Sequence, residues 1–238
     1  MPLPEGIWAV LLDIEGTTTS ISFVYDVLFP YAAARLDEYC SRPDPEPELA
    51  EALARLRAEY EDEKAHGADL PPFGDGAAYA RRLMAEDRKS TGLKLLQGVI
   101  WEEGYRTGEL RGHVFSDVPP ALKAWCAAGL RLRIFSSGSV RAQKLLFGHT
   151  DYGDLIPYFE GFHDTTTGPK REAASYTAIA AAYSLPAGAI LFLSDVREEL
   201  DAAAAAGMRT GLVVRPGNRP AEAGTHAVYR DFRELMPA

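Results

Sequence analysis

Four short apolar runs, each ending abruptly in polar or turn-forming residues, constrain the fold of this chain more than any other feature. The runs are Ile7–Leu12, Leu130–Phe135, Ala189–Leu193 and Leu212–Val214. Continuous apolar runs of this length are typical of strands buried on both faces of a parallel sheet. Helical patterns lie between the runs, at Pro119–Ala128, Val140–Leu146, Lys170–Tyr183 and Arg197–Ala206. This alternation predicts right-handed crossovers and an open parallel α/β sheet.

The segment over residues 20–112 differs from the rest because it contains no clear strand. Ala, Leu, Glu and Arg recur there at helical spacing, over Val27–Tyr39, Glu46–Ala65, Gly76–Glu86 and Leu93–Arg106. Prolines punctuate the boundaries between these segments. We therefore expect an all-helical cap domain over residues 20–112, inserted into a core domain of residues 1–19 and 113–238.

Charge and cysteine content exclude several classes of function. Lys and Arg number 25 against 34 Asp and Glu, a net charge of −9, which argues against nucleic-acid or anionic-membrane partners. Cys40 and Cys126 are the two cysteines, too few for a disulfide framework, and we expect reduced thiols. The first residues lack the pattern of a signal peptide, and no apolar run reaches the ~20 residues of a bilayer span. We expect a cytoplasmic protein and, without a coiled-coil pattern, a monomer.

Two carboxylates follow the first apolar run. Asp13 and Glu15 come directly after it, and Gly16 lets the backbone turn sharply. At the carboxyl end of a buried strand, both side chains project into the crevice where open α/β sheets bind ligands. Asp13 can act as a nucleophile with Glu15 as general acid/base, or both can hold Mg²⁺ through oxygen. A turn residue beside a solvated charge is the alternative interpretation.

Polar residues also follow the second run and precede a helical segment. Ser136 and Ser137 begin a Ser/Gly-rich turn, which either binds a phosphate or caps the next helix. Lys170 opens the next predicted helix, where a cation opposes the helix dipole. It either holds a phosphoryl group as a point charge or is a solvated lysine.

Asp195 ends the third run and is a candidate Mg²⁺ ligand. The charged residues after it, Arg197, Glu198, Glu199 and Asp201, are interpreted as the charged first turn of a helix, whose N-terminus suits the acids. A carboxylate nucleophile, a hydroxyl, a lysine and a metal-binding acid, in that chain order, form a phosphoryl-transfer constellation.

The order and spacing of these residues resemble the haloacid-dehalogenase-like (HAD) superfamily and, within it, the enolase-phosphatase family of methionine salvage. The matching segments are Asp13–Thr19, Phe23–Tyr31, Leu93–Gly98, Ser136–His149, Leu191–Val196 and Val213–Asn218. Glu15 stands where most HAD relatives carry Asp. Two positions depart from the family pattern, with Ser20 in place of Pro and Tyr25 in place of Lys.

The resemblance implies a Rossmann-like HAD core with a helical cap, and the activity of an acireductone synthase. The implied substrate is 2,3-diketo-5-methylthiopentyl-1-phosphate, which is enolised and then dephosphorylated. Asp13 is implied as phosphoryl acceptor, with Glu15 in the catalytic machinery. Asp13, Glu15 and Asp195 are implied as ligands of one Mg²⁺, and Ser136, Ser137 and Lys170 as substrate-binding residues.

Three competing interpretations stay open on the residues alone. A generic HAD phosphatase would hydrolyse another small phosphate ester without enolisation. A hydrolytic dehalogenase on the same fold needs no Mg²⁺, so Glu15 and Asp195 speak against it. A non-catalytic binding module would typically lack its nucleophile, whereas Asp13 is present.

Overall fold

The computed structural model describes residues 3–237 and contains two compact units. The core unit combines the chain up to Val24 with the chain from Arg111 onward, and the helical unit is Tyr25–Leu110. The domain boundaries expected from the sequence, after residues 19 and 112, stay a prediction. Each unit is described by itself below.

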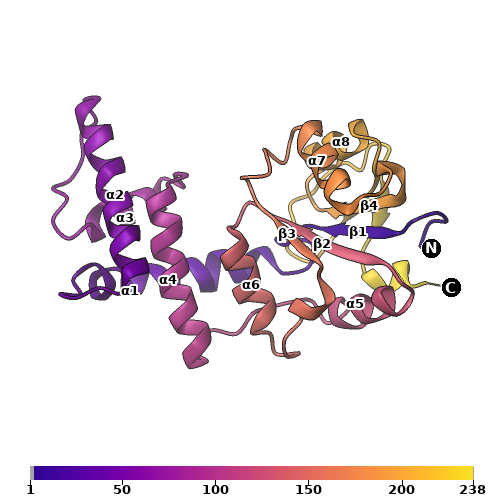
Figure 1. Ribbon diagram of the computed structural model, residues 1–238, viewed down its shortest axis with the longest axis horizontal. Coiled ribbons are helices and arrows are strands. Elements are labelled where there is room, and N and C mark those ends of the chain that lie inside the picture. Colours follow the sequence, from indigo (N-terminus) through magenta and orange to yellow (C-terminus); the bar gives the residue numbers. More distant parts are fainter. Residues whose placement is uncertain (1–2, 238) are drawn as a thin grey trace. The chain divides into compact units, whose positions relative to one another are not determined.

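The core unit is built on one six-stranded, wholly parallel sheet (Figure 1). Its strands, in spatial order, are β3 (Gly161–His163), β2 (Arg131–Phe135), β1 (Ala9–Leu12), β4 (Ile190–Ser194), β5 (Arg209–Val213) and β6 (Ala227–Tyr229). All four predicted strands are present, so the expected α/β fold with a parallel sheet is confirmed. The edge strands β3 and β6 were not predicted, because three residues are too few to form an apolar run.

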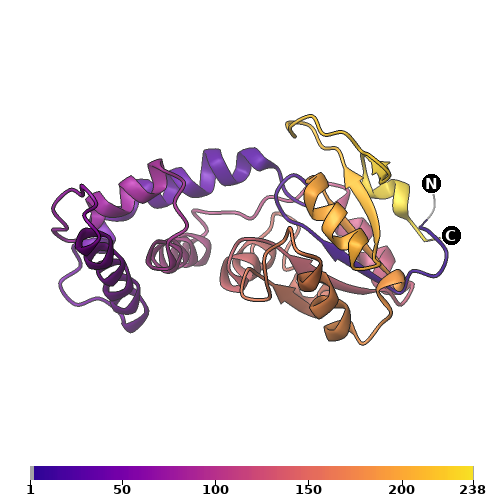
Figure 2. The same cartoon turned by 90° about the horizontal axis from the view of Figure 1, so that it is seen from above.

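Helices cover both faces of this sheet. They are α5 (Val118–Ala127), α6 (Val140–Gly148), α7 (Ala173–Tyr183) and α8 (Arg197–Ala205), with short 3₁₀ turns at Ile156–Tyr158, Ala187–Ala189 and Phe232–Leu235. Alternate residues of each strand point to opposite faces, so Leu11 and Phe192 pack with Ile179 of α7 and Leu200 of α8 in one buried cluster. Figure 2 looks onto this face, where α7 and α8 lie in front of the strands.

One predicted helix begins later than its sequence indicated. α7 starts at Ala173, and Lys170 lies in the turn before it, which corrects the expectation that Lys170 opens the helix. The turn is closed by a hydrogen bond from the Glu172 N–H to the Pro169 carbonyl at 3.1 Å. The Tyr176 hydroxyl donates to the Lys170 carbonyl at 2.7 Å, which ties the turn to the helix.

The helical unit contains no strand among its described residues, as expected. A π-helix over Phe23–Leu28 leads into it, followed by α1 (Phe29–Cys40), α2 (Pro47–Ala65), α3 (Ala77–Ala85) and α4 (Thr91–Thr107). α2 and α4 cross closely, because a Cβ atom on Gly92 would lie 2.5 Å from the Leu56 backbone nitrogen. Gly104 likewise lets the Tyr31 ring lie against α4.

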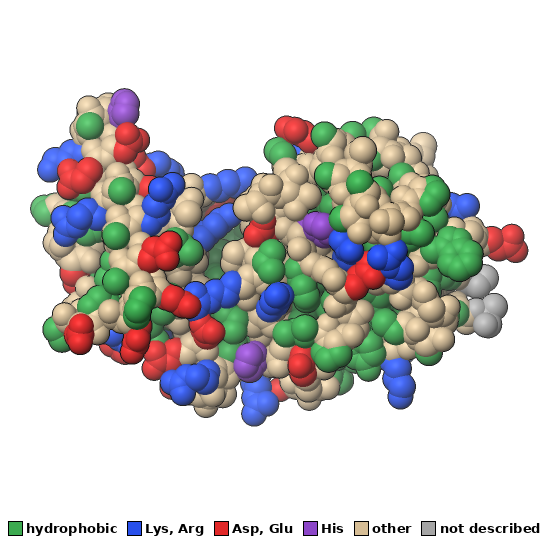
Figure 3. Space-filling view, viewed as in Figure 1, with side chains coloured by type: hydrophobic (Ala, Val, Ile, Leu, Met, Phe, Trp, Pro, Cys, Tyr) green, Lys and Arg blue, Asp and Glu red, His purple; other side chains and the backbone are tan. Residues whose placement is uncertain are grey.

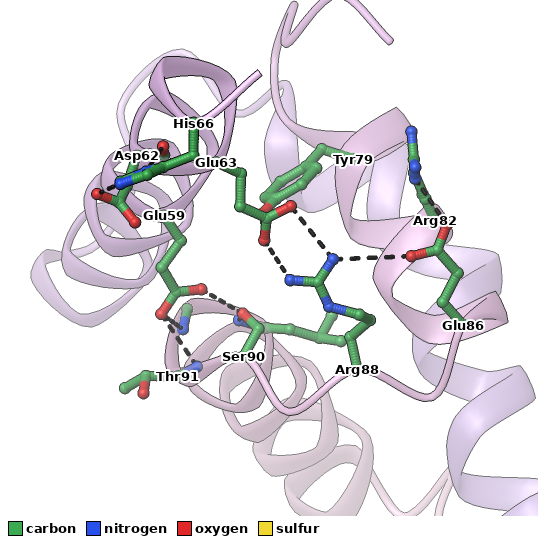
Figure 4. A network of polar contacts seen from close by, with 12 residues as sticks. Glu59, Asp62, Glu63, His66, Tyr79, Arg82, Glu86, Arg88, Ser90 and Thr91 are labelled. Atoms are coloured by element: carbon green, nitrogen blue, oxygen red, sulfur yellow. Dashed lines mark hydrogen bonds and ion pairs between the residues drawn. The ribbon is translucent and has the colours of Figure 1, made fainter. Parts of the chain in front are cut away.

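Polar contacts hold the ends of these helices in place (Figure 4). Glu59 of α2 accepts hydrogen bonds from the Thr91 and Gly92 N–H groups, both at 3.1 Å, and so satisfies free donors at the start of α4. Glu63 pairs with Arg88 at 2.6 Å and accepts from the Tyr79 hydroxyl at 2.8 Å. In Figure 3, acidic and basic side chains intermingle over this unit.

Two expectations about the chain as a whole also meet the structure. Cys40 and Cys126 are free thiols, as predicted. Within residues 3–237, every helix is too short or too polar to cross a membrane.

Candidate active site

The sheet brings the predicted polar residues to one edge. Leu12 of β1 pairs in register with Ile134 of β2 on one side and Leu193 of β4 on the other. Asp13 therefore follows the central strand, between the carboxyl ends of its two neighbours. The strand order places the topological switch point between β1 and β4, where open α/β sheets bind their ligands.

Asp13 is buried and held on both carboxylate oxygens. Its Oδ1 accepts from the Ile14 N–H at 2.7 Å and lies 2.7 Å from the Lys170 ammonium. Its Oδ2 accepts from the Ser194 hydroxyl at 3.1 Å. These contacts fix the orientation of the carboxylate, as a nucleophile requires.

Lys170 is not a solvated surface lysine, because its side chain is only 7% exposed. Its Nζ lies 2.7 Å from Asp13 and 2.6 Å from Glu199 Oε2. Burial lowers the pKa of Lys170, but the two carboxylates outweigh that effect and hold the pKa above its ordinary value. The ammonium is therefore a fixed positive charge beside the candidate nucleophile.

Glu199 belongs to this site, which corrects its interpretation as only a charge in the first turn of a helix. It is buried, and its Oε2 contacts Lys170 and lies 3.1 Å from the Ser194 hydroxyl oxygen. Burial and the Asp13 charge raise its pKa, while Lys170 lowers it. Glu198 beside it is exposed. The local sequence does not separate Glu199 from Glu198, because it does not say which face of α8 meets β4.

Asp195 follows β4 and packs against the loop after β1. A Cβ atom on Gly16 would lie 2.2 Å from Asp195 Oδ2, so only glycine allows this approach. Gly16 also has φ +69°, a conformation that favours glycine. Burial, then the charges of Asp13 and Glu199, raise the pKa of Asp195 to about 7. A carboxylate crowded by others in this way is stabilised by a cation.

Glu15 lies half-buried in the same loop. The loop is tightly wound, because the Thr18 and Thr19 N–H groups both donate to the Ile14 carbonyl at 2.9 Å. The Gly16 N–H donates to the Thr19 carbonyl at 2.8 Å. Glu15 is thereby carried on the same short loop as Asp13.

Ser136 and Ser137 follow β2, and they differ in exposure. Ser136 is buried, and its hydroxyl accepts from the Gly138 N–H at 3.2 Å, whereas Ser137 is exposed. The cap of α6 is Ser139, whose hydroxyl accepts from the Ala142 N–H at 3.3 Å. The helix-capping alternative therefore falls on Ser139, and the two predicted serines lie in the turn before it.

The donor set at the strand ends suits Mg²⁺. Among residues 3–237, no three His, Cys, Asp or Glu side chains gather into a ready-made metal cluster. Mg²⁺ does not require one, because it is usually bound by one or two carboxylates, waters and substrate phosphate. Asp13 and Asp195 are such a carboxylate pair. Because Gly16 has no side chain, Asp195 can lie against the loop at this point.

Comparisons with known proteins agree with this geometry. The sequence model of the haloacid dehalogenase-like hydrolase family matches residues 7–207. An enolase-phosphatase E1 from Synechococcus elongatus is 52% identical over 240 residues, which cover 99% of this chain and 100% of that protein. An enolase-phosphatase E1 from Pseudomonas aeruginosa is 53% identical, covering 89% of this chain and 91% of its own.

Solved structures extend the comparison to the fold. The UTR4 protein of Saccharomyces cerevisiae has a TM-score of 0.80 and 36% identity, with coverage of 96% of this chain and 100% of that one. CbbY from Rhodobacter sphaeroides, at 19% identity and a TM-score of 0.61, shows the fold alone. The resemblance found in the sequence motifs is confirmed: the chain belongs to the haloacid dehalogenase-like hydrolases and, within them, to the enolase-phosphatase E1 family.

Proposed function

We propose that this chain enolises 2,3-diketo-5-methylthiopentyl-1-phosphate and then dephosphorylates the enol, which yields the acireductone 1,2-dihydroxy-3-keto-5-methylthiopentene. The observation that carries the proposal is the buried Lys170, which bridges Asp13 and Glu199 at the switch point of the sheet. A fixed ammonium group beside a carboxylate nucleophile is suited to binding a phosphoryl group. The relatives that share about half of their residues with this chain supply the enolase half of the proposal.

Asp13 is the proposed phosphoryl acceptor. A carboxylate oxygen attacks phosphorus, the bond from phosphorus to the C1 oxygen breaks, and the acireductone leaves with a proton on that oxygen. Water then hydrolyses the aspartyl phosphate and returns Asp13 to its starting form. Lys170 offsets charge on the transferring group, and the Ser194 hydroxyl keeps the Asp13 carboxylate aligned.

Glu15 is the proposed acid/base group for both steps. In the first step it removes the C1 proton, which lies next to a carbonyl and is therefore acidic. In the second step it gives a proton to the departing enol oxygen. Its position two residues from Asp13, on the same tight loop, supports a role at the same substrate carbon.

Asp13, Glu15 and Asp195 would hold one Mg²⁺. When bound, the ion supplies Lewis acidity toward the diketone and the phosphoryl oxygens. The turn at Ser136 and Ser137, after the neighbouring strand β2, offers hydroxyl and N–H donors to the phosphate. We further propose that the chain acts as a cytoplasmic monomer.

Parallel measurement of ultraviolet absorbance and free phosphate tests this proposal. With the diketone phosphate and Mg²⁺, the wild-type chain is expected to produce an enol signal, acireductone and phosphate. Asp13→Asn is expected to abolish phosphate release, because it keeps the side-chain shape but loses the attacking oxygen. Glu15→Gln is expected to lose both signals, whereas Glu198→Gln, at an exposed position, serves as the matched control.

The possible outcomes separate the competing functions. Phosphate without any enol or acireductone signal would leave a plain HAD phosphatase. Full turnover in metal-free buffer would favour dehalogenase-type chemistry instead. Phosphate release by folded Asp13→Asn at more than a few per cent of the wild-type rate would remove Asp13 from the role of nucleophile.

A further inference from the structure

We propose that Arg215 and Asn218, in the loop after β5, are positioning residues that hold the catalytic loop after β1 in its working conformation. The inference rests on the proposed function, since it concerns the same Asp13, Glu15 and Asp195. Both residues come from the Val213–Asn218 segment, which the proposed chemistry does not use. They act on main-chain atoms of the loop, and they are assigned no contact with substrate.

Asn218 holds the loop at Gly16. Its side-chain amide donates to the Gly16 carbonyl at 2.9 Å and to the Val213 carbonyl at 3.3 Å. One amide group thus joins the loop after β1 to the end of β5. Gly16 is the residue against which Asp195 packs, so Asn218 fixes the backbone that sets the place of this carboxylate.

Arg215 holds the loop one residue further on. Its Nε donates to the Thr17 carbonyl at 3.0 Å, and its Nη1 pairs with Asp117 at 2.8 Å. The guanidinium carbon lies 4.5 Å from the ring centroid of Phe115 and 4.6 Å from that of Phe232. Its planar group is therefore fixed in direction before it meets the loop.

Stability alone does not account for this arrangement. The Arg215 and Asp117 side chains are only 3% and 4% exposed, and a buried ion pair is often no more stabilising than apolar residues of the same volume. Three buried polar atoms here, Thr17 Oγ1, Arg215 Nη2 and Asn218 Oδ1, have no hydrogen-bond partner within the described chain. Buried polar atoms without hydrogen-bond partners lower the stability of the fold. What these polar contacts provide in return is a single position for the backbone of Gly16 and Thr17.

The two contacts hold the backbone directly after the proposed catalytic residues. Asp13 lies at the end of β1, Glu15 follows it, and Gly16 and Thr17 are the next two residues. The Thr17 and Gly16 carbonyls accept from side chains that lie 198 and 202 positions away in the sequence. A shift of this backbone moves Glu15 relative to Asp13 and changes the space that Asp195 occupies. Mutation of residues that orient metal ligands typically lowers metal affinity or activity by about 10- to 100-fold.

Substitution of Asn218 is the sharper test, because Arg215 is needed to neutralise the buried Asp117. Asn218→Ala removes the amide and is expected to weaken Mg²⁺ binding, measured by titration calorimetry without substrate, about 10-fold or more, and to lower kcat more than it raises KM. Asn218→Asp keeps the shape but sets a carboxylate against two carbonyls, so its effect is expected to be larger. Arg219→Ala, at an exposed neighbour, is the matched surface control.

A second control separates positioning from a general loss of stability. Ile179→Val removes one buried methyl group from α7, away from the loop. It is expected to lower Tm by a few degrees and to leave the Mg²⁺ affinity unchanged. If the wild-type chain turns over the diketone phosphate, Asn218 variants with wild-type Mg²⁺ affinity and kcat would overturn the positioning role. A wild-type chain that binds Mg²⁺ but does not turn over that substrate would instead refute the proposed function, and the calorimetric arm would still decide the role of Asn218.

Discussion

Replacement of Lys170 by Met isolates the charge at the centre of the site. Methionine has a similar length and no charge, so the change removes the ammonium that lies 2.7 Å from Asp13 and 2.6 Å from Glu199. Both carboxylates stay buried without their cation. Removal of one partner of a buried ion pair typically costs about 3–5 kcal/mol.

That cost predicts a measurable fall in stability. For a chain of this size each kcal/mol shifts Tm by about 2–4 °C, so the expected loss is roughly 6–20 °C in EDTA at pH 8. With Mg²⁺ and substrate, kcat is expected to fall about 100- to 1,000-fold, because a preorganised charge on the transferring group is lost. Lys123→Met, at an exposed position of α5, is the control for removal of a surface lysine.

The double variant Lys170→Met/Glu199→Gln separates the two effects. Neutralising Glu199 relieves one of the unpaired charges, so much of the lost Tm is expected to return while kcat stays low. Calorimetric melting curves and steady-state phosphate release provide the two measurements. If Lys170→Met alone kept the wild-type Tm and kcat, the buried bridge would have neither the electrostatic nor the catalytic role assigned to it.

Two further predictions concern the neighbouring Asp195. Gly16→Ala is expected to lower Tm and abolish high-affinity Mg²⁺ binding in calorimetry, because its Cβ would lie 2.2 Å from Asp195 Oδ2; unchanged binding would contradict the close packing. The gain in unfolding free energy from Mg²⁺ is expected to rise with pH up to about 7, since folded Asp195, with its pKa raised to about 7, keeps a proton that the metal must displace. The Mg²⁺-dependent gain is measured, rather than stability itself, because burial also lowers the pKa of His113 and His163, which makes stability depend on pH without the metal. A gain that is flat with pH would show that Asp195 does not bind the ion.

The strands that carry the site could be predicted, because burial on both faces leaves a clear trace in the sequence. Strands β1 and β4 are apolar runs, whereas β2 alternates two arginines with apolar residues before it ends in Ile134 and Phe135. The polar residues after all three strands mark the carboxyl edge of the sheet. The edge strand β3 left no such trace. It is three residues long, half-buried throughout, and held by pairing with β2 rather than by an apolar face.

Side-chain partners across the sheet were harder to predict. Lys170 was expected to open a helix, whereas a turn carries it to Asp13 through the pairing of distant elements. Glu199 was interpreted as one of several solvated acids, because the sequence alone does not say which face of α8 meets β4. The roles of Arg215 and Asn218 depend on main-chain carbonyls, which have no sequence signature. In each case the missing information was the tertiary pairing, and local propensity carried none of it.

The charges at the strand ends explain how an acidic chain can accept an anionic substrate. When ionised, Asp13, Asp195 and Glu199 carry three negative charges, and Lys170 supplies one positive charge, which leaves a net of −2 in a largely buried site. Because an excess of negative charge is unfavourable in a buried site, carboxyl pKa values are raised there, as at Asp195. One divalent cation held by Asp13 and Asp195 would cancel the excess and would reduce the repulsion that a phosphate meets. Proton release from Asp195, metal binding and substrate binding at this edge of the sheet would then be thermodynamically linked.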